Sequence, residues 1–123
     1  MLSLERNRRY FWYRGVCDMR KSFRGLCYLA ETAMKGKLLS GDVFIFVNRR
    51  CNRMKLLVWD RDGFVIWYKH LEEGTFEVPR FGPGGNQLGY EELMLVLQGV
   101  RLSSVKRRKR YRHPRQNVEN LIV

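Results

Sequence analysis

The sequence has few acidic residues and few histidines. Asp and Glu number 12 and His 2 among 123 residues, against 24 Lys and Arg. A metal-dependent nuclease needs two or three carboxylates that converge on a metal ion, and a Cys–His nucleophile pair needs a well-placed histidine. The four aspartates that could converge each have a helix-cap or turn explanation: Asp18, Asp42, Asp60 and Asp62. We therefore expect no enzyme activity and no catalytic residue.

Cysteines and long apolar runs are also scarce. The three cysteines, Cys17, Cys27 and Cys51, are odd in number and lack the spacing of a metal site. We expect reduced thiols, no metal and no cofactor. No apolar run approaches the ~20 residues that a membrane helix needs. Four arginines among the first 14 residues interrupt any signal-like stretch, so we expect a cytoplasmic protein with no membrane partner.

Positive charge is what the chain has in excess. The net charge is +12 and the pI is near 10.2. Such an excess on a chain of this size favours a polyanionic partner, with nucleic acid as the first candidate and an anionic membrane surface as the second.

The charge is concentrated at the end of the sequence. Residues 101–123 hold eight Lys or Arg against one acid, Glu119. We predict one domain over residues 1–100 and a basic tail over residues 101–123 that is mobile without a partner. Consecutive cations on a flexible segment neutralise phosphates without reading bases; the alternative is a solvated charge run with no specific role. The tail cations predicted to bind nucleic acid are Lys106, Arg107, Arg108, Lys109, Arg110, Arg112 and Arg115.

Helical periodicity marks two segments. Apolar residues recur at helical spacing from Met19 to about Met34, and Asp18 is a plausible N-cap. A second helix is predicted over Tyr90–Gln98, where acids favour the first turn and Gly99 suits the C-terminal cap.

Strand patterns fill most of the remaining sequence. The predicted strands are residues 8–16, Asp42–Asn48, Lys55–Trp59, Phe64–Lys69 and Thr75–Val78, followed by a glycine-rich loop over residues 80–89. Asp62-Gly63 is expected to supply the positive φ of a tight hairpin turn. Pro79 favours an edge position for Thr75–Val78. The fold class is therefore α+β, with an antiparallel meander of three to four strands packed with one or two helices.

Two basic clusters lie within the domain. Arg20, Lys21 and Arg24 are placed in the first turns of the predicted helix, where the macrodipole disfavours cations. A phosphate partner would offset that cost, although three long side chains on a solvated face would also fit. The second cluster is Arg49, Arg50 and Arg53 with Lys55 at a hairpin tip, which either contacts nucleic acid or is simply solvated.

Three segments resemble a known family. DMRKSFRGL (Asp18–Leu26), SGDVFIFVNRR (Ser40–Arg50) and KLLVWDRDGFVIWYKHLEEGTFEVP (Lys55–Pro79) are similar to the TnpB-type accessory proteins of bacterial insertion sequences of the 66 family. The resemblance implies a protein that is encoded beside the transposase and is needed for efficient transposition. Arg24 departs from the family pattern, in which an acid often precedes the glycine.

The expected function is a non-enzymatic accessory factor that binds DNA, for example the element ends, and works with the transposase. One alternative is a module that docks on the transposase through Trp67, Tyr68 and the edge strand Thr75–Val78. Another is RNA binding, which the aromatic and arginine-rich composition would also suit. The sequence does not indicate an oligomeric state.

Overall fold

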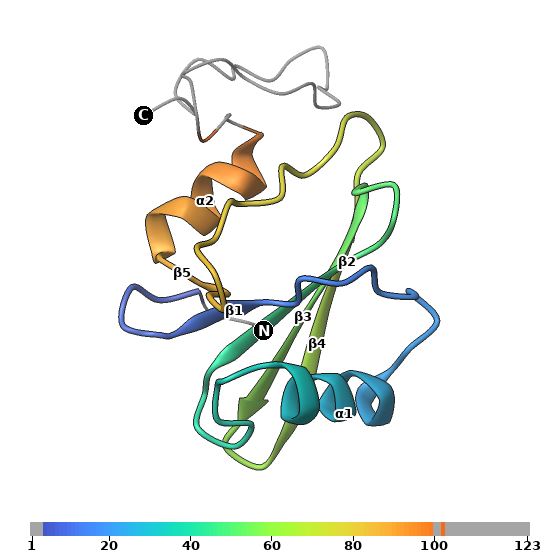
Figure 1. Ribbon diagram of the computed structural model, residues 1–123. Helices are drawn as coiled ribbons and strands as arrows, with labels where there is room; N and C mark the ends of the chain where they lie inside the picture. Colours follow the sequence, from blue (N-terminus) through green and yellow to red (C-terminus); the bar gives the residue numbers. More distant parts are fainter. Residues whose placement is uncertain (1–3, 100–101, 103–123) are drawn as a thin grey trace.

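The computed structural model describes residues 4–99 and 102, which form an α+β domain around one five-stranded sheet (Figure 1). The elements are β1 (Tyr10–Trp12), α1 (Phe23–Ala33), β2 (Val43–Val47), β3 (Arg53–Asp60), β4 (Gly63–His70), β5 (Gln87–Leu88) and α2 (Tyr90–Gln98). The strands lie side by side in the order β4-β3-β2-β1-β5. The fold class expected from the sequence is confirmed.

The sheet is mixed rather than wholly antiparallel. β2, β3 and β4 form the expected antiparallel meander. β1 runs parallel to β2, because the chain passes through α1 before it returns to the sheet. β5 pairs antiparallel with the other side of β1. Within the described residues, β4 and β5 are thus the two edges of the sheet.

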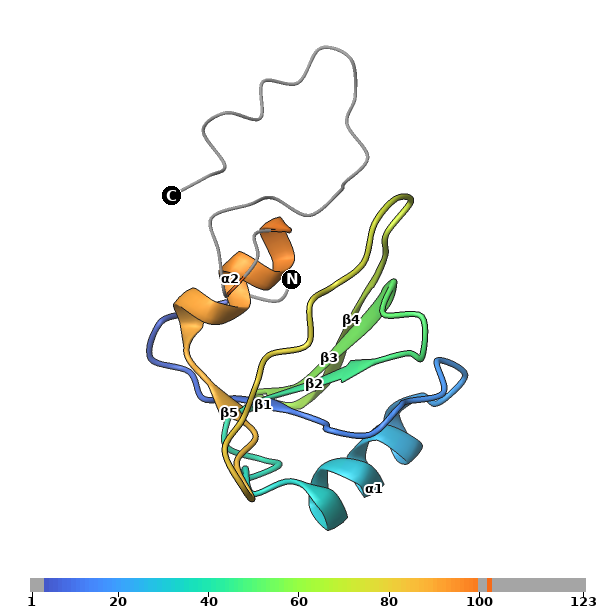
Figure 2. The same ribbon diagram turned by 45° about the horizontal axis from the view of Figure 1, so that its top comes forward.

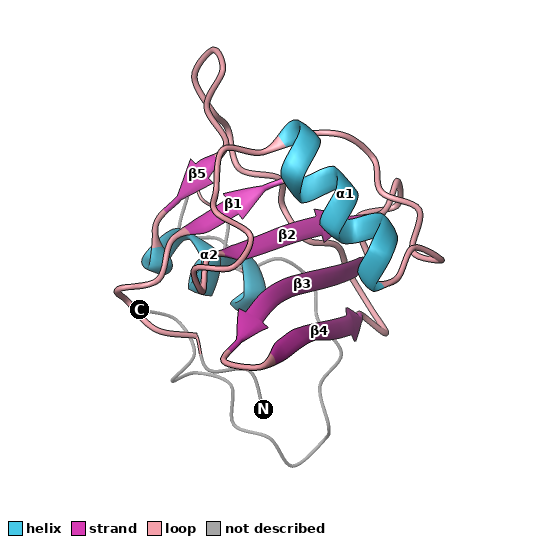
Figure 3. Cartoon of the chain, turned by 90° about the horizontal axis from the view of Figure 1, so that it is seen from below, coloured by secondary structure: helices cyan, strands magenta, loops and turns pink. Residues whose placement is uncertain are grey.

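The helices cover opposite faces of the sheet (Figures 2 and 3). β2 reads VFIFV and is buried throughout, because its alternate side chains enter two separate cores. Val43, Ile45 and Val47 belong to the core that contains Leu93 of α2. The core on the other face contains Phe44, Phe46 and, from α1, Leu26 and Ala30.

α1 begins four residues later than the sequence predicted. Asp18 closes a turn instead of capping the helix: its carboxylate accepts the Arg20 backbone N–H, and its carbonyl accepts the Lys21 N–H at 3.1 Å. Ser22 is the residue at the N-cap. α2 matches its predicted bounds, and Gly99 ends it in the left-handed conformation with φ of 80°.

Three strand predictions need correction. The predicted strand over residues 8–16 is regular only in β1. Thr75–Val78 is not a strand: Phe76 is buried in the α2-side core, and its backbone N–H donates to the Cys51 carbonyl at 2.6 Å. The short β5 lies inside the predicted glycine-rich loop. The conformation of Thr75–Val78 depends on its contact with Cys51, and that of β5 on its pairing with β1. These contacts are distant in sequence, so local sequence patterns do not predict them.

The β3–β4 turn is formed differently from the prediction. Asp60 pairs with Gly63, so Arg61 and Asp62 are the central residues. Arg61 has the positive φ, 56°, and Gly63 does not. The hairpin itself is confirmed. In the described part of the chain, no helix has the length and apolar character to cross a membrane.

Candidate nucleic-acid interface

The turn before α1 and the β2–β3 connection meet at one end of the sheet. The Cys17 backbone N–H donates to the Val47 carbonyl at 3.0 Å, which places the segment before α1 beside the end of β2. A cleft of about 450 Å³ opens between the two segments. Its lining residues are Val16, Cys17, Asp18, Met19, Arg20, Asn48, Arg49, Arg50 and Arg53. We call it the arginine cleft. It brings together residues from both basic clusters predicted within the domain.

Arg20 is the member contributed by the turn before α1. Its guanidinium binds both carboxylate oxygens of Asp18, with the Arg20 Nη2 to Asp18 Oδ2 distance at 2.7 Å. These hydrogen bonds from Arg20 lower the pKa of the Asp18 carboxyl to about 2. The Arg20 side chain is 90% exposed and remains open to solvent on its other sides. The cleft therefore combines four arginines with a single carboxylate, that of Asp18.

Asn48 shapes the loop that presents Arg49 and Arg50. Its side-chain oxygen accepts the backbone N–H groups of Asn52 and Arg53, each at 3.0 Å. Its amide nitrogen also donates to the Asn52 side chain at 2.8 Å. These bonds close the loop at its base, and Arg49 and Arg50 are exposed at its tip. The expectation of a basic loop at a hairpin end is met for these two residues.

Arg53 and Lys55 lie in β3 and not in the loop. Arg53 is half-buried, lines the cleft and lies opposite His70 of β4. Lys55 is buried, with 8% of its surface exposed. Its ammonium donates to the carbonyl oxygens of Met19 and Lys21, each at 2.7 Å. Lys55 thus extends from β3 to the turn before α1. The predicted position of Lys55 at a hairpin tip is wrong.

The other predicted cations are outside the cleft lining. Lys21 precedes α1 and Arg24 lies in its first turn; both are exposed. The macrodipole argument therefore applies to Arg24 and not to Arg20 or Lys21, which are not helical. The seven tail cations from Lys106 to Arg115 lie outside the described residues. Their role stays a prediction.

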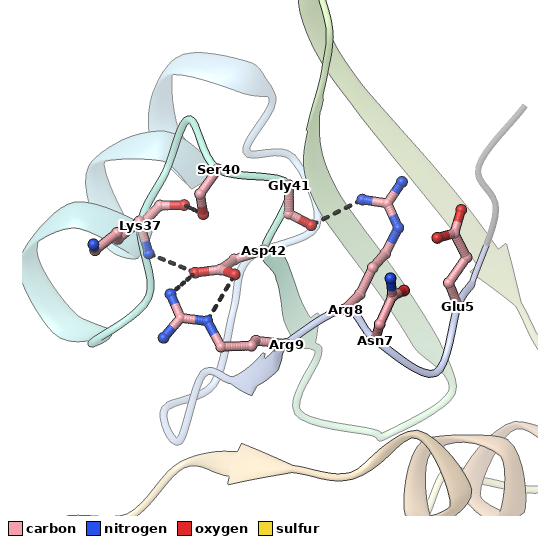
Figure 4. Close-up of a pocket in the computed structure, with 8 residues that line it drawn as sticks. All are labelled: Glu5, Asn7, Arg8, Arg9, Lys37, Ser40, Gly41 and Asp42. Carbon is pink, nitrogen blue, oxygen red and sulfur yellow. Dashed lines mark hydrogen bonds and ion pairs between the residues drawn. The ribbon is translucent and has the colours of Figure 1, made fainter.

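A second basic cleft, of about 480 Å³, was not predicted from the sequence (Figure 4). It lies where β1 and β2 begin, and Arg8, Arg9 and Lys37 contribute its cations. Asp42 is the buried centre: it accepts the Arg9 guanidinium at 2.6 and 3.0 Å and the Lys37 backbone N–H at 2.7 Å. The hydrogen bonds that Arg9 donates to the Asp42 carboxylate raise the pKa of Arg9. The Asp42 carboxylate thereby stabilises the loop before β2.

The described residues contain no group of three or more His, Cys, Asp or Glu that could hold a metal ion. The cysteines are free thiols, and burial raises the pKa of both Cys17 and Cys27. Such thiols are poor nucleophiles near neutral pH. The two clefts present the guanidinium groups of arginines to solvent.

Comparison with known proteins gives the family. Residues 8–107 match the model of the IS66 Orf2-like proteins. The chain is 33% identical to the uncharacterized protein y4jC of Sinorhizobium fredii over 91 residues, 74% of this chain and 78% of that protein. It is 28% identical to y4hO of the same species, also uncharacterized, over 100 residues, 81% of this chain and 87% of the relative. No solved structure matches. The chain belongs to the IS66 Orf2-like family of insertion-sequence accessory proteins.

Proposed function

We propose that this protein is a non-enzymatic accessory factor that binds the DNA backbone through the arginine cleft and supports transposition by the separate transposase. The convergence of Arg20 with the three arginines of the β2–β3 connection supports this proposal most strongly. These residues come from segments almost thirty positions apart in the sequence, and the fold gathers them around one opening.

The chemistry of arginine suits a phosphate ligand. A guanidinium offers a planar fork of N–H donors that matches phosphate oxygens and keeps its charge at any physiological pH. Arg49 and Arg50 are exposed on a braced loop, so the loop backbone loses little conformational entropy when they bind. Contacts of this type position a duplex without reading its bases. The proposal is therefore backbone binding, to which the tail cations would add.

The test is duplex binding by the full chain as a function of salt. Each phosphate contact contributes about −0.9 to the slope of log K against log salt concentration. We expect a variant with Arg49→Gln, Arg50→Gln and Arg53→Gln to bind more weakly and to lose about 2 to 3 units of that slope. A matched control removes three exposed cations outside the cleft, with Lys35→Gln, Arg61→Gln and Arg80→Gln.

The control has the same net charge as the cleft variant, so it separates a local site from a general charge effect. Equal losses in the two variants would contradict a site in the cleft. A complex that ignores salt, or no complex at low salt, would contradict DNA-backbone binding altogether. Competition with structured RNA at fixed salt tests the RNA alternative, since a preference for RNA would replace DNA as the partner.

A separate experiment addresses the transposase. Capture of the cognate transposase by the full chain, with and without residues 101–123, tests whether the two proteins associate. Capture that survives deletion of the tail while DNA binding is lost would favour the docking alternative. Loss of both would place the main contacts on the tail.

A further inference from the structure

The outer edge of β4 is a long unpaired strand in the described part of the chain. β4 has eight residues and pairs only with β3 among residues 4–99 and 102. Its central residues, Phe64 to Trp67, are apolar and only partly buried. Soluble proteins usually protect such edges with charges, bulges, prolines or short length. The middle of β4 has none of these protections.

The register identifies which backbone groups of β4 point outward. The Leu71 N–H donates to the Asn52 carbonyl at 2.8 Å, which is the next position after the Arg53–His70 pair. Bonded and non-bonded pairs alternate along an antiparallel ladder. Lys69, Trp67 and Val65 therefore direct their backbone groups toward β3. The backbone groups of Phe64, Ile66, Tyr68 and His70 are directed away from β3.

We propose that β4 pairs antiparallel with β4 of a second copy of this chain, with Ile66 opposite Ile66 on the two-fold axis. In β4 only the even-numbered residues direct their backbone N–H and C=O groups away from β3. In an antiparallel pair of two β4 strands, even-numbered residues must therefore lie opposite even-numbered residues. The arrangement centred on Ile66 places Phe64 opposite Tyr68, and it brings His70 beside Asp62 in the β3–β4 turn of the partner copy. Within β4 each of these pairs is apolar or aromatic, and at each end of the ladder the imidazole of His70 lies near the carboxylate of Asp62.

The neighbouring registers are less favourable. A pairing centred on Trp67 would bring Asp62 toward Glu72, which sets two carboxylates against each other. A pairing centred on Val65 would shorten the ladder to residues 63–67, against residues 63–69 for the pairing centred on Ile66. Charge and length therefore select the Ile66-centred arrangement. Its two-fold symmetry closes the assembly at two copies, since each chain offers one such edge in the described residues.

The dimer has a consequence for the arginine cleft, which rests on the proposed function. The two-fold axis is perpendicular to the joined sheet, so both copies present α1 on the same side. Arg53 lies opposite His70, so the two Arg53 residues are about eight residues apart along the strands and three strand spacings apart across them. These offsets amount to roughly 30 Å. One turn of duplex DNA is about 34 Å, so the two clefts fit successive turns on one side of a duplex.

Sedimentation of the full chain without DNA tests the dimer. The wild type is expected to form a concentration-dependent dimer. His70→Glu sets a carboxylate beside Asp62 twice per interface and should raise the dimer dissociation constant about tenfold or more. Asp62→Lys combined with His70→Glu restores opposite charges and should restore the dimer. Leu39→Glu, which changes the charge equally at an exposed position away from β4, should leave the dimer unchanged.

The outcomes separate this proposal from DNA binding. A wild type that is monomeric at every concentration, or that uses β4 for a transposase strand instead, overturns the assignment of a second copy. A dimer insensitive to His70→Glu, or not restored by the double change, overturns the β4 interface. A dimer that behaves as expected while the cleft variants bind DNA normally supports the interface and removes the proposed site.

Discussion

The ammonium of Lys55 lies 4.8 Å from the centre of the Tyr68 ring while it donates to two backbone carbonyls of the turn before α1. Strand β3 is thereby fastened to the segment that holds Arg20. A buried lysine needs such compensation, because an ammonium loses strong hydration when it leaves water. Carbonyl dipoles and an aromatic face supply it here.

Lys55→Met should destabilise the fold and loosen the turn. Methionine fills similar space but leaves the Met19 and Lys21 carbonyls without their donor, so we expect the free energy of unfolding to fall by about 1–3 kcal/mol. Urea unfolding measures it. Lys35→Met, at an exposed position, is the control.

The same variant tests how Arg20 is held. If Lys55 positions Arg20 for phosphate, Arg20→Gln will cost less duplex affinity in the Lys55→Met background than in the wild type. Strictly additive losses would show that the two residues act independently. Arg24→Gln is the comparison, since Arg24 lies outside the cleft lining and should give additive effects.

Asp18→Asn should tighten DNA binding. The carboxylate occupies part of the Arg20 fork, and its removal frees those donors and raises the local positive charge. We expect a steeper salt dependence by about one phosphate contact, or ~0.9 in slope. Salt titration of binding measures it. Glu31→Gln makes the same change in net charge on the exposed side of α1, and an equal effect there would refute the local explanation.

Asp18 should also give the folded state a defined acid sensitivity. Hydrogen bonds from Arg20 lower its pKa to about 2, against an ordinary value of 3.8. A carboxyl with a lowered folded-state pKa stabilises the protein above its unfolded pKa, and the contribution disappears as the pH falls toward the folded value. The difference in unfolding free energy between wild type and Asp18→Asn should therefore shrink between about pH 4 and pH 2. A difference that does not change over this range would contradict the ion pair.

Asp42→Asn should separate stability from binding. The buried carboxylate accepts the Lys37 backbone N–H and the Arg9 guanidinium, and asparagine cannot accept all of these bonds. We expect a loss of about 1–3 kcal/mol in unfolding free energy, with duplex affinity unchanged under conditions where the variant is folded. Glu31→Gln, at an exposed position of α1, should have little effect on stability. A binding loss in folded Asp42→Asn would indicate a role for the second cleft.

Gly36→Ala should disturb the α1-side core. A Cβ at position 36 would lie 2.7 Å from ring atoms of both Phe11 and Phe44, whose rings stack at 5.9 Å between centroids. Overpacking of this kind costs about 1–3 kcal/mol. Gly82→Ala is the matched control, because a Cβ there meets no atom within 4 Å. Thermal unfolding of both variants provides the comparison, and equal melting temperatures would contradict the close packing.

Local patterns predicted the central part of this fold. The β2–β3–β4 meander and α2 follow from apolar runs, the turn-favouring residues between β3 and β4 and a helix with a glycine cap, which are all local signals. The mixed edge does not follow, because β1 and β5 are short and depend on contacts distant in sequence. The turn before α1 was read as helix because its side-chain spacing is helical, whereas the Asp18 hydrogen bonds override that preference.

The candidate site was predictable in composition and not in geometry. Arg20, Arg49, Arg50 and Arg53 were recognisable as cations in two clusters, but their meeting depends on how α1 is placed beside the end of β2. Lys55 was grouped with the loop cations because charge alone does not reveal burial. The second basic cleft was not predicted, because Arg9 meets Asp42 only through the pairing of β1 with β2, and Lys37 meets it only through the fold of the loop before β2.

The pairing of β1 with β5 also sets the order in which the chain can complete its fold. Tyr10 lies opposite Leu88, so the first strand synthesised is enclosed only after nearly the whole domain has been made. Until then the buried side chain of Trp12 belongs to an open sheet edge. Contacts this distant in sequence slow folding. A chain that ends before residue 87 therefore lacks both β5, which pairs with β1, and α2, which covers one face of the sheet.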